Sequence, residues 1–587
     1  MTRKRRSKNL YKLARSPIAG TLLLVLALAH GNCSIEGDGA RHYGNVVVPR
    51  TQEFRWSDGA LPQTFDPAFA ATPPDTDVVR AIFEGLTDYD SRTLAVIPGV
   101  ATRWEAANSG RVWTFYLRED ARWSNGDSVT ASDFVRSWQR TLKIGDLAPH
   151  TELFSNIQGS RRAVAVLPQT PSENSHQKSR KPHQSRPPTA KVAESFGAEA
   201  IADHILRVHL ERPDMSFPAL VAHPVFRPVK IKAGDFDGRI SPVNLVSNGA
   251  FLLAKTEADR VLLQRADNYW DKSGVRLEQV TFVNNGDPES ALAAYRAGNI
   301  DAVTNAAFEP LATKLLAPYG DFRRNTYGAL TYYSFNSSHP PFDDVRVREA
   351  LTLAIDRERI SADYMNGATE AAKKFFPDSM TNSAKPVVGK TELLEKDAER
   401  ARGLLAEAGF PGGEAFPKIR LLINRNDQQR LVAQSVATMW RAVLNVETEI
   451  IVKNWDEYEA IIRAGEYDVV RRGLVMQTTD ELMNLELLFE HEKLPLSQNN
   501  SLGDGPRPSP TSGAKSGSRE STSELTPIES ESQALSELRA MPIYFASSYS
   551  LVKPYIVGFD SNVLDAPSLK KVQVDVAWHQ PRGARSE

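Results

Sequence analysis

WTFYLREDARWSNGDSVTASDFVRSWQR, residues 113–140, changes its hydrophobic period twice. Trp113, Phe115 and Leu117 alternate with Val, Thr and Tyr, which predicts a buried or half-buried strand over residues 112–117. Asn125-Gly126-Asp127 supplies the residue types of a tight chain reversal. The stretch therefore begins as a strand followed by a turn.

The second half of the stretch predicts a helix. Thr130 stands three residues before Asp133, which is the spacing of a capping box at a helix N-terminus. Residues that recur every four positions are expected to pack inward, and these are Phe134, Trp138 and Leu142. The face expected to meet solvent carries Arg136, Gln139 and Arg140.

Length and charge limit the classes of function. The chain has 587 residues, with 71 Lys and Arg against 72 Asp and Glu. Such a length predicts more than one folded unit, and the balanced charge predicts no nucleic-acid partner. The single cysteine, Cys33, excludes an intrachain disulfide and a cysteine metal cluster. The sequence contains no hydrolase elbow, zinc-protease pair, phosphate loop or dinucleotide fingerprint, so we expect no enzyme activity, no cofactor and no metal.

The first residues predict export. Basic residues precede the mainly apolar run Ile18–Ala29, which is typical of an export signal and is shorter than the about 20 residues of a membrane span. We assign residues 1–45 to this signal and a linker. Ala27-Leu28-Ala29 fits cleavage that releases a free periplasmic protein, whereas Cys33 fits the lipidated first residue of a lipoprotein. Both alternatives predict a periplasmic or cell-envelope location.

Several motifs resemble one family. In the opening stretch, WTFxLR, WSNGDxVTAxDF and SWxR resemble the signature of the oligopeptide-binding family, family 5, of extracytoplasmic solute receptors of ABC importers. Further resemblances lie in Phe83-Glu84-Gly85-Leu86, in Ser247–Phe251, in Asn268–Asp271 and in residues 332–360. The resemblance covers nearly all of the chain after the export signal except two low-complexity segments. It implies an α/β, two-lobed periplasmic binding protein of type II with a hinge and an extra domain.

The resemblance also implies a division of the chain. Lobe I is expected to comprise residues 46–83, 208–356 and 553–587, the extra domain residues 84–207, and lobe II residues 357–552. Residues 169–190 and 498–532 are poor in large apolar residues, so we expect both inserts to be disordered.

Periodicity predicts alternating helices and strands in lobe II. The expected helices span residues 398–408, 428–444 and 455–464, and the expected strands span 419–423, 446–452 and 467–471. This order predicts parallel strands in an α/β layer. The helix at 428–444 is expected to pack through Leu431, Ser435, Met439 and Val443. Asp344 is expected to cap another helix, whose outward face carries Arg346, Arg348, Glu349 and Arg357.

Ligand contacts are implied by position within the family. The residues that match its ligand-facing positions are Tyr333, Asn336, Trp455, Arg471, Gly473, Tyr544 and Phe545. Tyr333, Trp455 and Phe545 fit core packing equally well, because aromatic residues are commonly buried. The resemblance implies a peptide or small solute as ligand, an ABC permease of the inner membrane as partner, and a monomer.

The chain departs from the family where a peptide's α-ammonium is anchored. Gln477 stands where the family has an Asp, Leu474 replaces a Trp, and an acidic residue usual near Ala71 is missing. Asp480 is the nearest acidic residue that could take over the anchor. Three readings remain open: a peptide receptor anchored by Asp480, a receptor for a non-peptide solute, and a degenerate receptor that acts as an envelope interaction protein.

Overall fold

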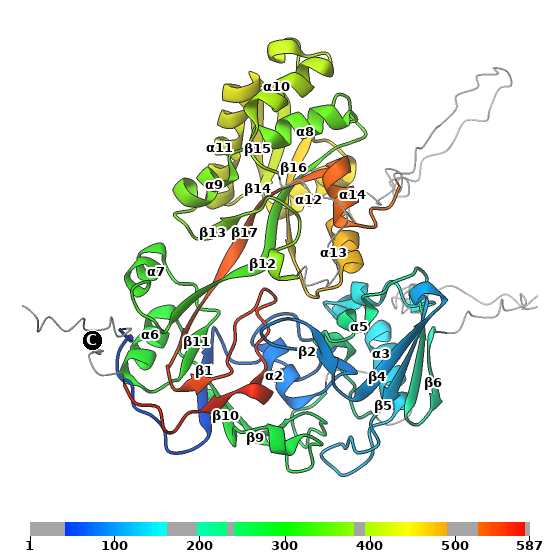
Figure 1. Ribbon diagram of the computed structural model, residues 1–587, viewed down its shortest axis with the longest axis vertical. Helices are drawn as coiled ribbons and strands as arrows, with labels where there is room; N and C mark the ends of the chain where they lie inside the picture. The colour runs from blue at the N-terminus through cyan, green and yellow to red at the C-terminus, as the bar shows by residue number, and fades with distance from the viewer. Residues whose placement is uncertain (1–40, 161–195, 232–239, 381–393, 490–525, 581–587) are drawn as a thin grey trace, which may run out of the picture.

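Two long strands join the two lobes of the protein. A computed structural model describes residues 41–160, 196–231, 240–380, 394–489 and 526–580. Strands β12 (Phe322–Phe335) and β17 (Ala540–Val552) run from one lobe into the other (Figure 1). They pair antiparallel, with register shifts between Thr326 and Leu330 and between Thr331 and Tyr332. The predicted two-lobed α/β fold is confirmed. The register shifts interrupt the β12–β17 ladder where it passes between the lobes, and this is the position of the hinge.

Lobe I is built around β1 (Glu53–Asp58). This strand lies between two parallel neighbours, β10 (Gln279–Val283) and β11 (Ala302–Thr304). Two antiparallel strands, β9 (Arg260–Arg265) and β8 (Phe251–Thr256), extend the sheet. Phe54 and Trp56 alternate with polar residues along β1, and both aromatic side chains are fully buried in the core of lobe I.

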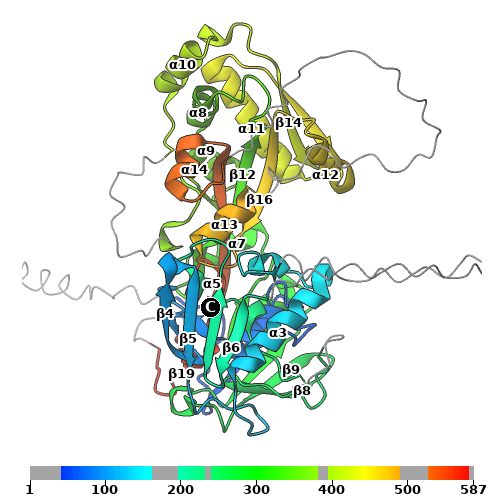
Figure 2. The same cartoon turned by 90° about the vertical axis from the view of Figure 1, so that its right-hand side faces the viewer.

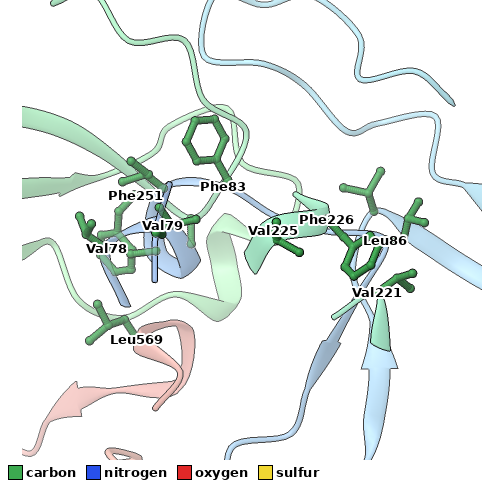
Figure 3. Packing of buried hydrophobic residues seen from close by; sticks show 14 of the residues in the cluster. Val78, Val79, Phe83, Leu86, Val221, Val225, Phe226, Phe251 and Leu569 are labelled. Atoms are coloured by element: carbon green, nitrogen blue, oxygen red, sulfur yellow. The ribbon is translucent and has the colours of Figure 1, made fainter. Parts of the chain in front are cut away.

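The core of lobe I joins distant parts of the sequence. Figure 3 shows Val78 and Val79 of α2 (Asp75–Ile82) close to Phe251 of β8 and to Leu569 from the C-terminal part of the chain. Val225 and Phe226 continue the same buried cluster toward the extra domain. The lobe is therefore closed by chain segments that lie far apart in sequence.

The extra domain is a four-stranded antiparallel sheet covered by one helix. The strand order is β4 (Ala101–Ala107), β5 (Val112–Leu117), β7 (Ile205–His209) and β6 (Ala198–Ala202). Helix α3 (Ala131–Ile144) lies against this sheet (Figure 2). Its core belongs to the same buried cluster as β1, so the extra domain shares the core of lobe I.

The opening stretch folds largely as its sequence predicts. Strand β5 has the expected bounds, the Thr130–Asp133 capping box is present, and Phe134, Trp138 and Leu142 are buried. The prediction for Arg140 is wrong. Its guanidinium is buried and pairs with Asp66, whose Oδ2 lies 2.5 Å from Nη2. The helix pattern does not contain this information, because Asp66 lies 74 residues earlier.

Lobe II has the predicted alternation of helices and strands. Strand β14 (Ile419–Asn424) pairs parallel with β15 (Thr448–Lys453) and with β16 (Val469–Val475). The helices of this lobe include α8 (Val345–Leu353), α10 (Ala398–Glu407), α11 (Asp427–Leu444) and α12 (Trp455–Ala464). Strand β16 then pairs antiparallel with the hinge strand β12.

Three predictions for lobe II need correction. Helix α11 buries Ser435 and Met439 of the predicted face together with Val432, Val436 and Trp440, while Leu431 is 51% exposed, so the inward face is centred to one side of the predicted one. Arg348 and Arg357 are buried and donate to backbone carbonyls rather than facing solvent. Helix α8 shares its core with α10 and α11, so the lobes do not divide at residue 356. They divide within β12 and β17.

The remaining elements complete the two lobes. The helices are α5 (Phe217–Leu220), α6 (Pro288–Ala297), α7 (Pro310–Leu316), α9 (Arg357–Arg359), α13 (Glu481–Leu488) and α14 (Glu531–Glu537). The strands are β2 (Thr87–Tyr89), β3 (Val96–Pro98), β13 (Thr369–Ala371), β18 (Ile556–Val557) and β19 (Gln573–Val574). In the described part of the chain, no helix combines the length and apolar character needed to cross a bilayer.

The low-complexity predictions fall mostly outside the described residues. This holds for residues 169–190, for residues 498–525 and for Cys33. The predicted end of the second insert at Ser532 is corrected. Ile528 is buried, and Ser530 caps α14 by accepting from the backbone N–H of Gln533. A buried apolar anchor and a helix start give these residues a fixed place in lobe II.

Candidate functional site

Strand β16 presents an open edge beside the hinge. Its pairing with β14 ends at Val470, while its other edge continues along β12 as far as Val475. In the described part of the chain, no strand pairs with the outer edge of β16 from Arg471 onward. Gly473, in the middle of this edge, is exposed. An extended ligand chain can hydrogen bond to such an edge as an added strand.

Arg471 and Tyr333 stand directly opposite each other on β16 and β12, so their side chains share one face of the sheet. The Nε atom of Arg471 and the hydroxyl of Tyr333 are buried without hydrogen-bond partners among the described residues. Burial raises the pKa of Tyr333, so its hydroxyl keeps its proton. Buried polar atoms are nearly always paired, so these two are the expected contacts of a ligand.

The same polar face continues onto α11 and β17. Gln429 Nε2 donates to the Tyr544 hydroxyl at 2.8 Å, and Gln429 Oε1 has no partner among the described residues. Arg471 Nη2 lies 3.4 Å from Thr331 Oγ1. The face thus combines a guanidinium with neutral donors and acceptors. It can receive a carboxylate at Arg471 and carbonyl or amide groups beside it.

Trp455 is connected to the open edge through Tyr458. Trp455 is 60% exposed, and its ring stacks on Tyr458, with centroids 5.5 Å apart. The Tyr458 hydroxyl donates to the carbonyl of Arg471. This arrangement holds an exposed indole near β16, where it can contact an apolar ligand group.

Asn336 and Phe545 occupy structural positions. The Asn336 amide donates to the carbonyls of Gly465 and Tyr467, which ties β12 to the end of α12. Phe545 is 3% exposed and belongs to a hydrophobic cluster. The structure therefore brings together Tyr333, Arg471, Gly473 and Tyr544, with Trp455 nearby, and assigns Asn336 and Phe545 to the framework.

Asp480 is buried at the start of α13. Its Oδ1 accepts from the backbone N–H of Met483 at 2.7 Å, and its residue surface is fully buried. Burial, and then the negative charge of neighbouring Asp214, raise the pKa of Asp480 well above its ordinary value. The Asp480 carboxyl is therefore held in a place that disfavours its charged form, and it serves as a helix cap beside Asp214. This placement does not present a carboxylate to a ligand.

Two histidines that the sequence analysis did not single out line the other end of this region. His223 is 1% exposed, and its Nδ1 accepts from the backbone N–H of Val225 at 3.2 Å. His150 meets it edge to face at 4.9 Å between ring centroids and contacts the Ala71 carbonyl through Nε2 at 2.9 Å. Burial, and then His150, lower the pKa of His223 well below its ordinary value. No sequence signal marks these isolated loop histidines, because they meet only in the fold.

The loop after β16 connects the histidines to lobe II. Gln477 lies beside His223, although no hydrogen bond of good geometry reaches the His223 Nε2 atom. The Thr478 hydroxyl lies 3.0 Å from the Tyr89 hydroxyl of lobe I. Arg212 and Glu486 form an ion pair at 2.5 Å between the extra domain and α13. In both views α13 lies at the level where the lobes meet (Figures 1 and 2).

No metal centre is found in the described part of the chain. The described residues contain no group of three or more His, Cys, Asp or Glu side chains arranged to hold a metal ion. What this region offers is an open strand edge, an arginine with an unpartnered nitrogen, and neutral polar side chains.

Comparisons with known proteins agree with this geometry. Residues 95–493 match the family described as "Bacterial extracellular solute-binding proteins, family 5 Middle". The chain is 29% identical over 516 residues to the periplasmic murein peptide-binding protein MppA of Escherichia coli strain K12, which covers 85% of this chain and 89% of MppA. It is 30% identical over 511 residues to the periplasmic oligopeptide-binding protein OppA of Salmonella typhimurium, covering 86% and 89% of the two chains.

A solved structure of similar architecture is the unliganded open form of the periplasmic murein tripeptide-binding protein MppA. The match has a TM-score of 0.70 at 25% sequence identity and covers 92% of this chain and 99% of that chain. The two lobes of this protein are therefore arranged as in an open solute receptor.

Proposed function

The chain belongs to the bacterial extracellular solute-binding proteins of family 5, and we propose that it binds an extended peptide or peptide-like ligand for delivery to an ABC-type importer. The observation that carries this proposal is the open edge of β16 beside Arg471. Backbone hydrogen bonds to a strand edge are independent of ligand side chains, whereas Arg471 pairs with an acidic end. The curated relatives MppA and OppA, both peptide-binding by name, support a peptide as ligand.

The proposed ligand contacts are the groups that lack partners in this open form. Arg471 would pair with a ligand carboxylate, and Tyr333, Gln429 and Tyr544 would hydrogen bond to neighbouring polar groups. The exposed ring of Trp455 would cover an apolar side chain. Closure of the lobes about β12 and β17 would remove the ligand from water.

A direct test measures thermal stabilisation by peptides. The purified protein is heated with an equimolar pool of random tetrapeptides, with an inert sugar as the negative control. A ligand at about 100 times its dissociation constant stabilises the folded state by about 2.7 kcal/mol, so the melting temperature should rise with peptide concentration. An unchanged melting temperature at millimolar peptide would contradict the proposal.

We infer that the protein binds its ligand without converting it, because its relatives are binding proteins. Mass spectrometry after prolonged incubation should recover the peptide pool intact. Cleavage that persists after repeated purification, and that the Arg471→Ala variant lacks, would contradict this inference.

We also propose export through the basic and apolar leader, followed by release or by lipidation at Cys33, and action as a monomer with an inner-membrane permease. Intact-mass measurement of the mature protein separates the two endings. A free protein begins after the Ala27-Leu28-Ala29 segment, whereas a lipoprotein begins at Cys33 and carries added acyl mass.

A further inference from the structure

We propose that the His223 end of the site receives a neutral, hydrogen-bond-accepting group of the ligand, such as an N-acyl carbonyl, and disfavours a free α-ammonium. This inference rests on the proposed function, because it names the class of peptide-like ligand that the same site takes. Three observations support it. The buried Nε2–H of His223 has no hydrogen-bond partner among the described residues, no free carboxylate lies near it in the described part of the chain, and Gln477 lies beside it.

The unused donor is the His223 ring. Its Nδ1 accepts from the backbone N–H of Val225, so the neutral ring carries its hydrogen on Nε2. That Nε2–H is buried without a partner among the described residues. A buried donor without a partner is costly, and an acceptor on a ligand would satisfy it. An ammonium group has only hydrogens to offer and cannot do so.

The described carboxylates near His223 each already have a hydrogen-bond or ion-pair partner. Asp480 is fully buried and caps α13 through the backbone N–H of Met483, and Asp214 accepts from the backbone N–H of Ser216 at 2.7 Å and is 6% exposed. Glu152 is directed at His150, with 3.4 Å between Oε1 and Nδ1. The Ala71 carbonyl contacts His150 Nε2 at 2.9 Å.

The aspartates farther into lobe I are also paired with cations. Asp77 binds Arg80 at 3.0 Å, and Asp88 binds Lys570 at 2.7 Å and Arg227 at 3.3 Å. The charged neighbours that lower the pKa of His223 are His150, Arg80 and Arg227, which are basic residues. A ligand ammonium placed here would therefore lose its water without gaining an anionic partner.

Gln477 completes a neutral subsite. Its side chain lies beside His223 and is half-buried, so it can donate to or accept from a ligand amide. At the other end of the β16 loop, Arg471 favours an acidic group. The ligand class that fits both ends is an N-acylated or otherwise N-uncharged peptide with a free carboxylate.

The test lets two forms of one ligand pool compete. Equal concentrations of random tetrapeptides with free N-termini and of the same peptides after N-acetylation are mixed with the wild-type protein, and native mass spectrometry measures the bound ratio. The acetylated form should be in excess by about tenfold, which is the scale of one charge-assisted hydrogen bond. An equal ratio, or an excess of the free form, would overturn the inference.

A variant adds a second measurement. Gln477→Asp introduces a carboxylate and should shift the bound ratio toward free peptides by about tenfold. Gln434→Asp introduces the same charge at an exposed position on α11 and should leave the ratio unchanged. An unchanged ratio in Gln477→Asp would count against the inference. If neither pool binds the wild-type protein, the proposed peptide ligand itself is refuted, which distinguishes the two failures.

Discussion

Two buried aspartates that cap helix N-termini, Asp133 in a capping box and Asp480 as the N-cap residue itself, lie in opposite electrostatic surroundings. Asp133 of α3 accepts from the backbone N–H of Thr130 at 2.9 Å and from Trp123 Nε1 at 3.2 Å, and it pairs with Arg136 at 2.5 Å. Asp480 caps α13 by the bond to Met483 but faces the Asp214 carboxyl. The capping geometry is local and can be read from sequence. The charge depends on what the fold places opposite the carboxyl.

The largest expected effect is a loss of packing in the core of lobe I. Trp138→Ala should reduce the free energy of unfolding by about 3–5 kcal/mol, because a fully buried indole is removed from the core of lobe I. Its Nε1 also loses the bond to the Phe226 carbonyl. Chemical denaturation measures the change.

Trp455→Ala is the matched control for this experiment. Trp455 is 60% exposed, so removal of its ring should cost less than about 1 kcal/mol. Similar losses for the two variants would contradict the account of α3 as a buried helix.

A smaller loss of unfolding free energy is expected when each of the two aspartates is replaced by asparagine. Asp133→Asn should cost about 2 kcal/mol at pH 7, because it removes charge-assisted bonds to a buried carboxylate. Asp480→Asn should cost less than about 0.5 kcal/mol, because asparagine keeps the cap and replaces a carboxyl whose charged form is disfavoured by burial and by Asp214. Equal losses measured by urea denaturation would show that Asp480 is ionised in the folded protein.

The smallest effect is a change in pH dependence. Asp480 ionises near pH 3.8 when it is free of these neighbours, and burial with Asp214 raises its folded pKa. Between the two values the folded state binds more protons, so this group lowers the free energy of unfolding as pH rises. Asp480→Asn should therefore become more stable relative to wild type as the pH rises from about 4 to about 7.5. Parallel stability curves for the two proteins would refute the raised pKa.

Local elements of the fold were predictable because their signals lie within short windows. The bounds of β5 and α12 and the cap at Thr130 follow from period and spacing. The buried arginines were not predictable from helix faces. Arg140 meets Asp66, and Arg348 meets the carbonyl of Glu537, which lies 189 residues away.

The site residues also fall into two groups, those that the sequence predicts and those that only the fold reveals. Arg471, Gly473 and Tyr544 could be chosen from the family motifs, and the structure places them near the open edge of β16. His150 and His223 lie in separate loops and carry no spacing signal, so only the fold reveals that their rings meet. The raised pKa of Asp480 likewise depends on burial and on Asp214, which comes from another lobe of the molecule.

The central claim is that a ligand lies along the open edge of β16 with its acidic end at Arg471. The most direct measurement is isothermal titration of wild type, Arg471→Ala and Arg472→Ala with one bound peptide from the pool and with its C-terminal amide. Arg472 is the matched control, because it is the next residue of the strand, points to the opposite face and lies 3.5 Å from Glu459.

We predict that Arg471→Ala weakens binding of the free-acid peptide by about tenfold or more, and that amidation weakens wild type similarly but has little further effect on this variant. Arg472→Ala should bind both forms as wild type does. An unchanged affinity in Arg471→Ala, with its melting temperature intact, would contradict the account.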